Sequence, residues 1–223
     1  MLDPQILARP GTVLLDTARP DAANRRSWCF DAPRRVLTAS TSAELSALLS
    51  EATALTADGA YVAGYVSYEA GAAFVDLPME TTADEPLAWF GVYEAPHPVA
   101  PSEVATGLSR LGGEAVVTDV EFGVSQAEYT SAIDRVRHHI GEGDVYQINY
   151  TAPVDFRLEG DPRVLYRRLR QRQHVPYGAY LNLGDRQILS CSPELFFRRE
   201  NERVVTRPMK GTIRRGRTQS EDQ

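Results

Sequence analysis

Cysteine is scarce in this chain of 223 residues, and its two cysteines, Cys29 and Cys191, lie far apart in the sequence. A secreted domain held together by disulfides would carry more cysteines in a shorter chain. Neither the cysteines nor the four histidines follow the spacing of a zinc site. We therefore expect two buried thiols and no disulfide framework.

Long apolar runs are absent as well. No stretch approaches the roughly 18 apolar residues that cross a membrane. The first residues, MLDPQILARPG, have neither the basic start nor the apolar stretch of a secretion signal. The sequence therefore predicts a cytoplasmic protein that does not enter a membrane.

The excess of basic residues that is typical of nucleic-acid-binding proteins is also missing, because the net charge is −6. Charge is unevenly spread: residues 1–120 carry 7 basic and 16 acidic side chains, whereas residues 121–223 carry 17 and 14. The front part is therefore about −9 and the back part about +3. This balance suits an anionic small molecule bound by the back part, and a solvated arginine-rich face would give the same count.

Lysine is the rarest charged residue. The chain has 24 lysines and arginines, and Lys210 is the only lysine among them. Arginine can replace lysine on most surfaces, but a guanidinium stays protonated, whereas an amine can lose its proton and act as a base or nucleophile. Lys210 is therefore a candidate for chemistry that needs an amine. The alternative is chance survival under a strong arginine bias.

Apolar periodicity predicts three helices. Residues 41–57 and residues 125–140 each carry an apolar stripe behind a capping box, and a third helix is expected over residues 161–174. The boxes are formed by Thr41 with Glu44 and by Ser125 with Glu128, and Gly141 is the expected stop of the second helix.

Aromatic and β-branched stretches between turn residues predict the strands. They cover residues 13–16, 61–68, 88–94, 115–118, 145–151, 177–183, 187–190 and 203–206. In the strand expected at 145–151, Gln147 and Asn149 would share a polar face that could line a pocket. The three prolines of residues 95–101 indicate a surface loop. Hairpin-connected strands interspersed with helices predict an α+β fold instead of a doubly wound parallel sheet.

Five sequence blocks carry a family resemblance. The blocks GDVYQIN (143–149), SPELF (192–196) and TRPMKGT (206–212) resemble the opening of the chorismate-binding domain in the chorismate-utilising enzymes. This family includes the aminodeoxychorismate, anthranilate and isochorismate synthases. The blocks VLLDT (13–17) and GYVSYE (64–69) resemble its N-terminal region. The resemblance covers nearly the whole chain and is closest to the large subunits of aminodeoxychorismate synthases.

The resemblance implies a fold and a division of the chain. The expected fold consists of antiparallel sheets packed as a β-sandwich with peripheral helices, as in the large subunits of anthranilate synthases, and it is incomplete here. Residues 1–120 correspond to the N-terminal region and residues 121–223 to the beginning of the chorismate-binding domain. Family members continue past this point with the acidic residues that hold Mg²⁺.

Three expectations follow from that incompleteness. The implied cofactor is Mg²⁺, with no metal ligand in this chain. The 223-residue polypeptide alone is expected not to turn over chorismate. Because a half-fold exposes sheet edges, we expect either self-association or a complementing C-terminal chain.

Two residues have catalytic counterparts in the family. A lysine in the Pro-x-Lys-Gly-Thr form marks aminodeoxychorismate synthases, whereas anthranilate and isochorismate synthases usually carry alanine there. The resemblance implies that the Lys210 amine attacks C2 of chorismate while the C4 hydroxyl leaves, and that ammonia then enters at C4 and expels the lysine. Burial and nearby positive charge, such as Arg207 or Arg214, would favour the neutral amine. Glu194 matches the family's general acid for the departing hydroxyl, although an acid after Ser-Pro can also cap a turn.

Three further residues match substrate contacts. Gln147 occupies the position where water-adding family members place a lysine base, and glutamine cannot deprotonate water. The incoming group is therefore expected to be ammonia, supplied by a glutamine amidotransferase. Gly211 and Thr212 are expected beside the substrate, because their loop must approach it closely.

Relatives also bind tryptophan, as an inhibitor or as a structural ligand. The matching positions, which could equally be plain core, are Leu15, Asp16, Thr17, Pro176, Tyr177 and Gly178. The resemblance thus implies amination of chorismate to 4-amino-4-deoxychorismate in the p-aminobenzoate branch of folate biosynthesis. Two alternatives remain open: the large subunit of an anthranilate synthase, and a non-catalytic fragment that binds only an effector or a partner.

Overall fold

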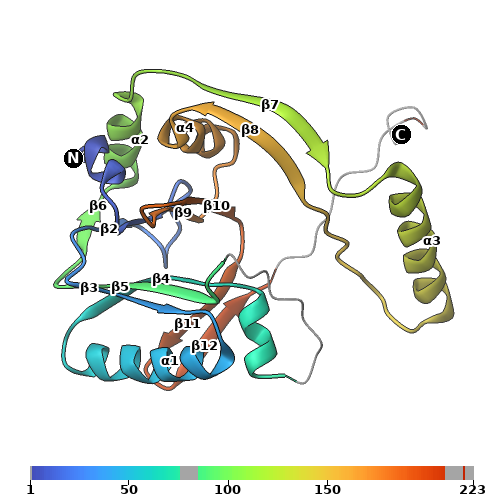
Figure 1. Cartoon of the computed structure of the whole chain (residues 1–223), viewed down its shortest axis with the longest axis horizontal. Coiled ribbons are helices and arrows are strands. Elements are labelled where there is room, and N and C mark those ends of the chain that lie inside the picture. The colour runs from blue at the N-terminus through green and yellow to red at the C-terminus, as the bar shows by residue number, and fades with distance from the viewer. Residues whose placement is uncertain (1, 76–84, 209–217, 219–223) are drawn as a thin grey trace. The chain divides into compact units, whose positions relative to one another are not determined.

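The computed structural model describes residues 2–75, 85–208 and 218 (Figure 1). The chain forms two compact units. The main unit comprises Met1–Leu111 and Tyr166–Gln223, and the small unit comprises Gly112–Leu165. The family resemblance implies a different division, between an N-terminal region ending near residue 120 and the start of the chorismate-binding domain. That division stays a prediction.

Two antiparallel sheets form the main unit. The larger sheet has the strand order β10-β9-β1-β2-β6, and the smaller has the order β3-β5-β4. The strands of the larger sheet are β1 (Thr12–Asp16), β2 (Ser27–Phe30), β6 (His97–Val99), β9 (Tyr177–Asn182) and β10 (Gln187–Ser192). Those of the smaller sheet are β3 (Arg35–Ala39), β4 (Tyr61–Val66) and β5 (Ala88–Tyr93). Together with the helices, this arrangement confirms the predicted α+β class with antiparallel sheets.

An apolar cluster joins the two sheets. Side chains alternate along a strand, so Val13 of β1 faces this cluster while Leu14 and Asp16 face the other way. The Tyr93 hydroxyl of β5 also donates a hydrogen bond of 2.7 Å to the Gly11 carbonyl at the start of β1. The cluster contains Val13, Phe30 and Leu181 from the larger sheet and Ala63, Trp89 and Tyr93 from the smaller one. This is the face-to-face packing of a β-sandwich.

Helix α1 (Ser42–Ala57) covers the outer face of the smaller sheet. The Thr41 hydroxyl accepts from the Glu44 amide at 3.2 Å, and the Glu44 carboxylate accepts from the Thr41 amide at 3.2 Å. The capping box predicted from the sequence is therefore confirmed. Leu45 and Leu48 are buried in a cluster with Leu37 of β3.

Helices α2 (Pro101–Ser109) and α4 (Pro162–Arg172) are connected through arginines of α4. Arg170 donates to the Pro101 carbonyl at 3.1 Å, and Arg167 donates to the Leu111 carbonyl at 2.8 Å. The Tyr166 ring of α4 lies 5.6 Å from the Tyr180 ring of β9. Part of α4 thus packs on the face of the larger sheet opposite to the apolar cluster. Two short 3₁₀ helices complete the main unit at Pro4–Ala8 and Glu69–Ala73.

A buried carboxylate lies between this helix and the sheet. Asp16 is 2% exposed and accepts hydrogen bonds from three side chains. Arg170 donates to it through Nε at 2.6 Å and Nη2 at 3.3 Å, Tyr166 through its hydroxyl at 3.0 Å, and Ser27 through its hydroxyl at 2.9 Å. A buried charge is tolerated only when it is paired and hydrogen-bonded, and both conditions are met here.

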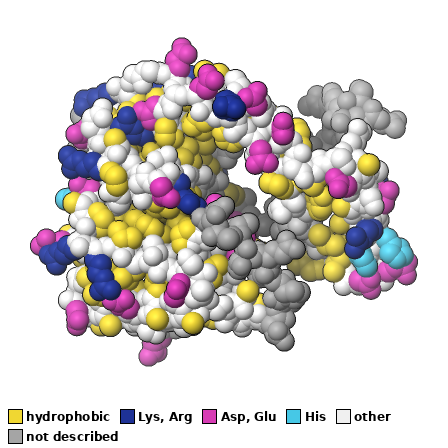
Figure 2. Space-filling model, in the orientation of Figure 1, with side chains coloured by type: hydrophobic (Ala, Val, Ile, Leu, Met, Phe, Trp, Pro, Cys, Tyr) yellow, Lys and Arg dark blue, Asp and Glu magenta, His cyan; other side chains and the backbone are white. Residues whose placement is uncertain are grey.

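The small unit contains a two-stranded ribbon and one long helix. Strand β7 (Ala115–Phe122) pairs with β8 (Val154–Gly160), and the register shifts by one residue between Thr118 and Glu121. Helix α3 (Gln126–Glu142) begins at its predicted Ser125 capping box and buries no residue. Hydrophobic side chains consequently appear at the surface around α3 (Figure 2). They include Tyr129 of the helix and Phe122 of the ribbon, which are 49% and 71% exposed.

Several local predictions are wrong. Residues 145–151 form no strand, because a strand needs a hydrogen-bonded neighbour and the described part of the chain provides none there. Residues 95–101 are not only a loop, since β6 lies within them. Gly141 lies inside α3, and Gly143 ends the helix with a left-handed φ of 82°. No sequence pattern predicted β2, β3, β8, α2 or the strand β11 (Leu195–Glu200).

Replacing Asp16 with asparagine is expected to lower the free energy of unfolding by about 3–5 kcal/mol, because the buried Arg170 guanidinium then has no counter-charge. Urea unfolding followed by circular dichroism measures the change. Glu94→Gln is the matched control, since its ion pair with Arg34 at 2.8 Å is exposed and contributes at most about 1 kcal/mol. Equal losses in the two variants would contradict this account of Asp16.

The two thiols should differ in reactivity. Burial, aided by the charge of Asp31, raises the pKa of the Cys29 thiol to about 12. Cys191 is only partly buried. Since the thiolate is the reactive form, iodoacetamide at pH 8 should alkylate Cys191 of the native protein well before Cys29. Peptide mass spectrometry measures both rates, and faster labelling of Cys29 would contradict the packing of β2.

Candidate functional site

Glu194 lies at the entrance to a separate hairpin of the main unit. Strands β11 (Leu195–Glu200) and β12 (Arg203–Arg207) pair antiparallel, with Leu195 opposite Arg207. The Ser192 hydroxyl accepts from the Glu194 amide at 3.2 Å and donates to the Glu194 carbonyl at 3.1 Å. Ser192 therefore fixes the backbone at Glu194. The hairpin brings this acid next to the segment that leads into Pro-x-Lys-Gly-Thr.

A pocket of about 330 Å³ opens at this place. Its lining consists of Ser192, Glu194, Leu195, Phe196, Thr206 and Pro208. Glu194 is exposed, so its carboxyl is accessible to a molecule in the pocket. Two of the predicted blocks, SPELF and TRPMKGT, thus share one pocket. Lys210, Gly211, Thr212 and Arg214 lie outside the described residues.

Arg207 is not a free positive charge beside the lysine segment. Its Nη1 donates to the Asp21 carboxylate at 2.8 Å. Asp21 offsets much of the field that Arg207 could exert on a neighbouring amine, so Arg207 favours a neutral lysine less than its charge alone suggests. No sequence signal points to Asp21, because nothing in the sequence links two residues separated by 186 positions.

Gln147 belongs to the small unit. Its side-chain amide donates to the Asn149 side chain at 3.1 Å, and both residues are exposed. The two side chains therefore contact each other, as expected for residues on one polar face. Their backbone, however, is irregular and does not form the predicted strand. Glu194 belongs to the main unit.

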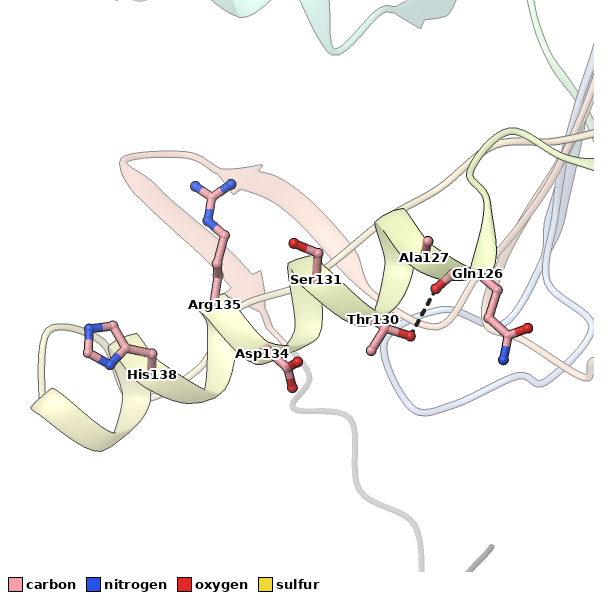
Figure 3. A pocket seen from close by; sticks show the side chains of 7 residues that line it. All are labelled: Gln126, Ala127, Thr130, Ser131, Asp134, Arg135 and His138. Carbon is pink, nitrogen blue, oxygen red and sulfur yellow. Dashed lines mark hydrogen bonds between the residues drawn. The ribbon is translucent and has the colours of Figure 1, made fainter.

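The two hollows of the small unit are less suited to a reaction than the Glu194 pocket. The larger one, about 950 Å³, runs along a single face of α3, where Gln126, Thr130, Asp134 and His138 follow one another by one turn (Figure 3). One helix face cannot enclose a ligand, so this hollow is open surface. A second hollow of about 450 Å³ is lined mainly by apolar and aromatic side chains, including Phe122, Tyr129 and Tyr150.

The two segments predicted to bind tryptophan do lie side by side. Asp16 of β1 pairs with Gly178 of β9. The Asn24 side chain donates to the Pro176 carbonyl at 2.6 Å. A side chain at Gly178 would begin 3.0 Å from the Tyr166 hydroxyl, so glycine permits this close approach beside Asp16.

The polar groups of these segments are already used within the protein. Asp16 binds Arg170, and the Thr17 hydroxyl lies 3.0 Å from both the Asn24 side chain and the Arg26 carbonyl. Leu15 is 38% exposed. The buried hydroxyl of Tyr177 makes no hydrogen bond among the described residues. Asp16 and Thr17 therefore serve the fold, and the Tyr177 hydroxyl is the buried polar group of these segments whose hydrogen bond is still unmade among the described residues.

The described residues contain neither a candidate membrane span nor a candidate metal-binding group. No helix in residues 2–75 or 85–208 is both long and apolar enough to span a membrane. Over the same residues, no three histidine, cysteine or acidic side chains gather into a group that could hold a metal ion. The Mg²⁺ that the family resemblance implies was expected to have no ligand in this chain, and it stays a prediction.

Curated relatives share parts of the sequence. The anthranilate synthase component 1 of Methanothermobacter marburgensis is 31% identical over an alignment of 182 residues that covers 71% of this chain and 38% of that protein. The corresponding protein of Thermus thermophilus is 35% identical over 129 residues, covering 58% and 26%. The aminodeoxychorismate synthase component 1 of Bacillus subtilis is 36% identical over 95 residues, covering 43% and 20%. The chain therefore spans less than half the length of these relatives.

The family itself is shown by a longer match. The model of the chorismate binding enzymes aligns with residues 17–223, which begin at Thr17, directly after Asp16, and include the Glu194 hairpin. The match contains four of the five sequence blocks in full and the last residue of the block VLLDT. The chain therefore belongs to the chorismate binding enzyme family.

Proposed function

We propose that this protein forms 4-amino-4-deoxychorismate from chorismate and ammonia, the reaction of the aminodeoxychorismate synthases. The observation that carries the proposal is the position of the only lysine in the chain, two residues after Pro208 in the wall of the Glu194 pocket. An acid and an amine in adjoining segments suit a reaction in which a hydroxyl leaves and nitrogen enters. The product would enter the p-aminobenzoate branch of folate biosynthesis.

The proposed mechanism has two displacements. The neutral Lys210 amine attacks C2 of chorismate, both conjugated ring double bonds shift, and the C4 hydroxyl departs as water after it receives a proton from Glu194. Ammonia then attacks C4, both double bonds shift back, and the lysine leaves C2 as a neutral amine. The Glu194 carboxylate recovers its proton from the ammonium group formed at C4. Lysine is thus a temporary substituent that is restored at the end. Gly211 and Thr212 contact the substrate in this scheme.

Gln147 argues against a reaction in which water is the incoming group. A carboxamide cannot deprotonate water, so hydroxide does not compete with ammonia from that position. We propose that a glutamine amidotransferase supplies the ammonia and that the protein is cytoplasmic. We also propose Mg²⁺ as the metal ion of the reaction. Tryptophan binding near Tyr177 and completion of the fold by another chain or by self-association are proposals as well.

Anthranilate synthase activity is the second candidate. It is favoured by the names of the relatives from Methanothermobacter marburgensis and Thermus thermophilus, whose matches extend over longer parts of this chain than that of the Bacillus subtilis protein. Lys210 favours the first candidate, because anthranilate synthases usually carry alanine there. Chromatographic identification of the product as a 4-amino or a 2-amino compound separates the two.

Replacing Lys210 with alanine is expected to lower 4-amino product formation by at least about 10²-fold or to redirect the amination, because the nucleophile is lost. The measurement uses the protein as its gene encodes it, with chorismate, ammonium and Mg²⁺. Lys210→Arg is the matched control, since it keeps the charge but cannot become neutral, and it should be as inactive as the alanine variant. Unchanged output of aminodeoxychorismate would contradict the proposal.

Replacing Glu194 with glutamine should reduce kcat by about 10²- to 10⁴-fold, because the leaving hydroxyl loses its proton donor. Chorismate binding, measured by calorimetry, should change little. Glu202→Gln is the control, since Glu202 is an exposed carboxylate in the turn of the same hairpin. A glutamine variant at 194 with normal kcat would show that this acid only caps its turn.

A further inference from the structure

The hairpin that carries Glu194 has little apolar support among the described residues. Phe196, Phe197 and Val204 are 87%, 56% and 66% exposed, and Leu195 and Val205 are half-buried. The clusters that pack the two sheets and helix α1 contain no residue of β11 or β12. Hydrophobic burial therefore explains only part of the hairpin's place on the main unit.

Two arginines of the hairpin reach the same loop. Arg207 donates to the Asp21 carboxylate at 2.8 Å, and Arg198 lies 3.5 Å from the Ala23 carbonyl. Both contacts join the hairpin to residues 19–26, the connection between β1 and β2. The contacts are polar and span 186 and 175 positions of the sequence.

The loop is shaped before the arginines reach it. Oδ1 of Asp21 accepts from the amides of Ala23 and Asn24, each at 2.7 Å, while Oδ2 receives Arg207. Asn24 in turn donates to the Pro176 carbonyl at the start of β9. One carboxylate thus closes the turn of the loop and also binds the hairpin.

Asp21 remains charged at neutral pH. The hydrogen bonds from the Ala23 and Asn24 amides, and then that from Arg207, hold the pKa of the carboxyl below its ordinary value of 3.8. The ion pair therefore persists throughout the neutral range and is lost only when the pH falls through that lowered pKa.

We infer that Asp21 and Arg207 are positioning residues, and that the loop of residues 19–26 is a polar latch that sets the place of the β11–β12 hairpin and of Glu194. The placement rests on contacts alone, whereas its effect on catalysis rests on the proposed function. An exposed ion pair is weak, so the hairpin should detach locally without unfolding of the sandwich.

Hydrogen exchange followed by mass spectrometry tests the latch. Asp21→Asn keeps an oxygen for the Ala23 and Asn24 amides and removes only the charge, and Arg207→Gln removes the other partner. Either variant should accelerate exchange in residues 195–207 by up to about fivefold, the range of an exposed pair. Exchange in β1 and β9 should not change. Glu94→Gln, which breaks the exposed pair with Arg34, is the control and should leave the hairpin unaffected.

Three further results distinguish the latch from general loosening. The double variant Asp21→Asn with Arg207→Gln should exchange no faster than either single variant, since both remove the same interaction. Arg207→Lys, which keeps the charge, should restore part of the protection. In 1 M NaCl the wild type should resemble Asp21→Asn. Identical hairpin exchange in the wild type and in both single variants would overturn the inference.

A kinetic readout connects the latch to the proposed reaction. Asp21→Asn should lower kcat severalfold, with a smaller change in KM, because Glu194 is misplaced while the other substrate contacts remain. Arg207→Lys should recover part of the loss. Failure of the unmodified protein, as its gene encodes it, to aminate chorismate would count against the proposed function, and the exchange comparison would still decide whether the latch exists.

Discussion

The main unit depends on one buried charge. Asp16 ends β1, and its carboxylate simultaneously receives Ser27 from β2 and two side chains from α4. Because an unpaired charge in this place would be very costly, the strand, its neighbour and the helix are specified together. Hydrophobic packing alone would tolerate small shifts between helix and sheet, whereas the Arg170 fork fits its carboxylate in one geometry.

Strand β1 connects a buried, hydrogen-bonded part of the main unit with an exposed loop that contacts the β11–β12 hairpin. Thr17, directly after Asp16, is buried and hydrogen-bonded, and a few residues later the chain exposes Asp21, which pairs with Arg207 of the β11–β12 hairpin at the surface. Elements that must adjust to a ligand are usually drawn from the low-stability end of a fold. The proposed site follows this rule, since Glu194 belongs to a hairpin without a core of its own.

Local sequence signals predicted much of the fold. The capping boxes at Thr41 and Ser125 depend on residues three apart, so a short window contains all the information that they need. Residues 145–151 were misassigned because alternation shows only which side chains could share a face. A strand also requires a neighbouring strand, which may be far away in sequence.

Long-range polar contacts were beyond the reach of the sequence. The Asp16–Arg170 and Asp21–Arg207 pairs span 154 and 186 positions of the sequence. Helix α4 also contains several arginines, and the sequence alone does not show which of them pairs with Asp16. The blocks around Glu194 and Lys210 were recognisable because of the family resemblance. That the first of them shares a pocket with Pro208 follows from the pairing of β11 with β12, which no residue pattern states.

The ribbon of the small unit shows how one extra residue changes the sidedness of a strand. Val117 and Phe122 are separated by an odd number of positions, so in a regular strand they would face opposite ways. The register shift, at which Asp119 adopts a left-handed φ of 51°, places two residues of β7 opposite one of β8. Both side chains therefore join Val154 on the same apolar face. Without that additional residue, the side chains at one end of β7 would point to the opposite face, and the continuous apolar surface would be divided into two short ones.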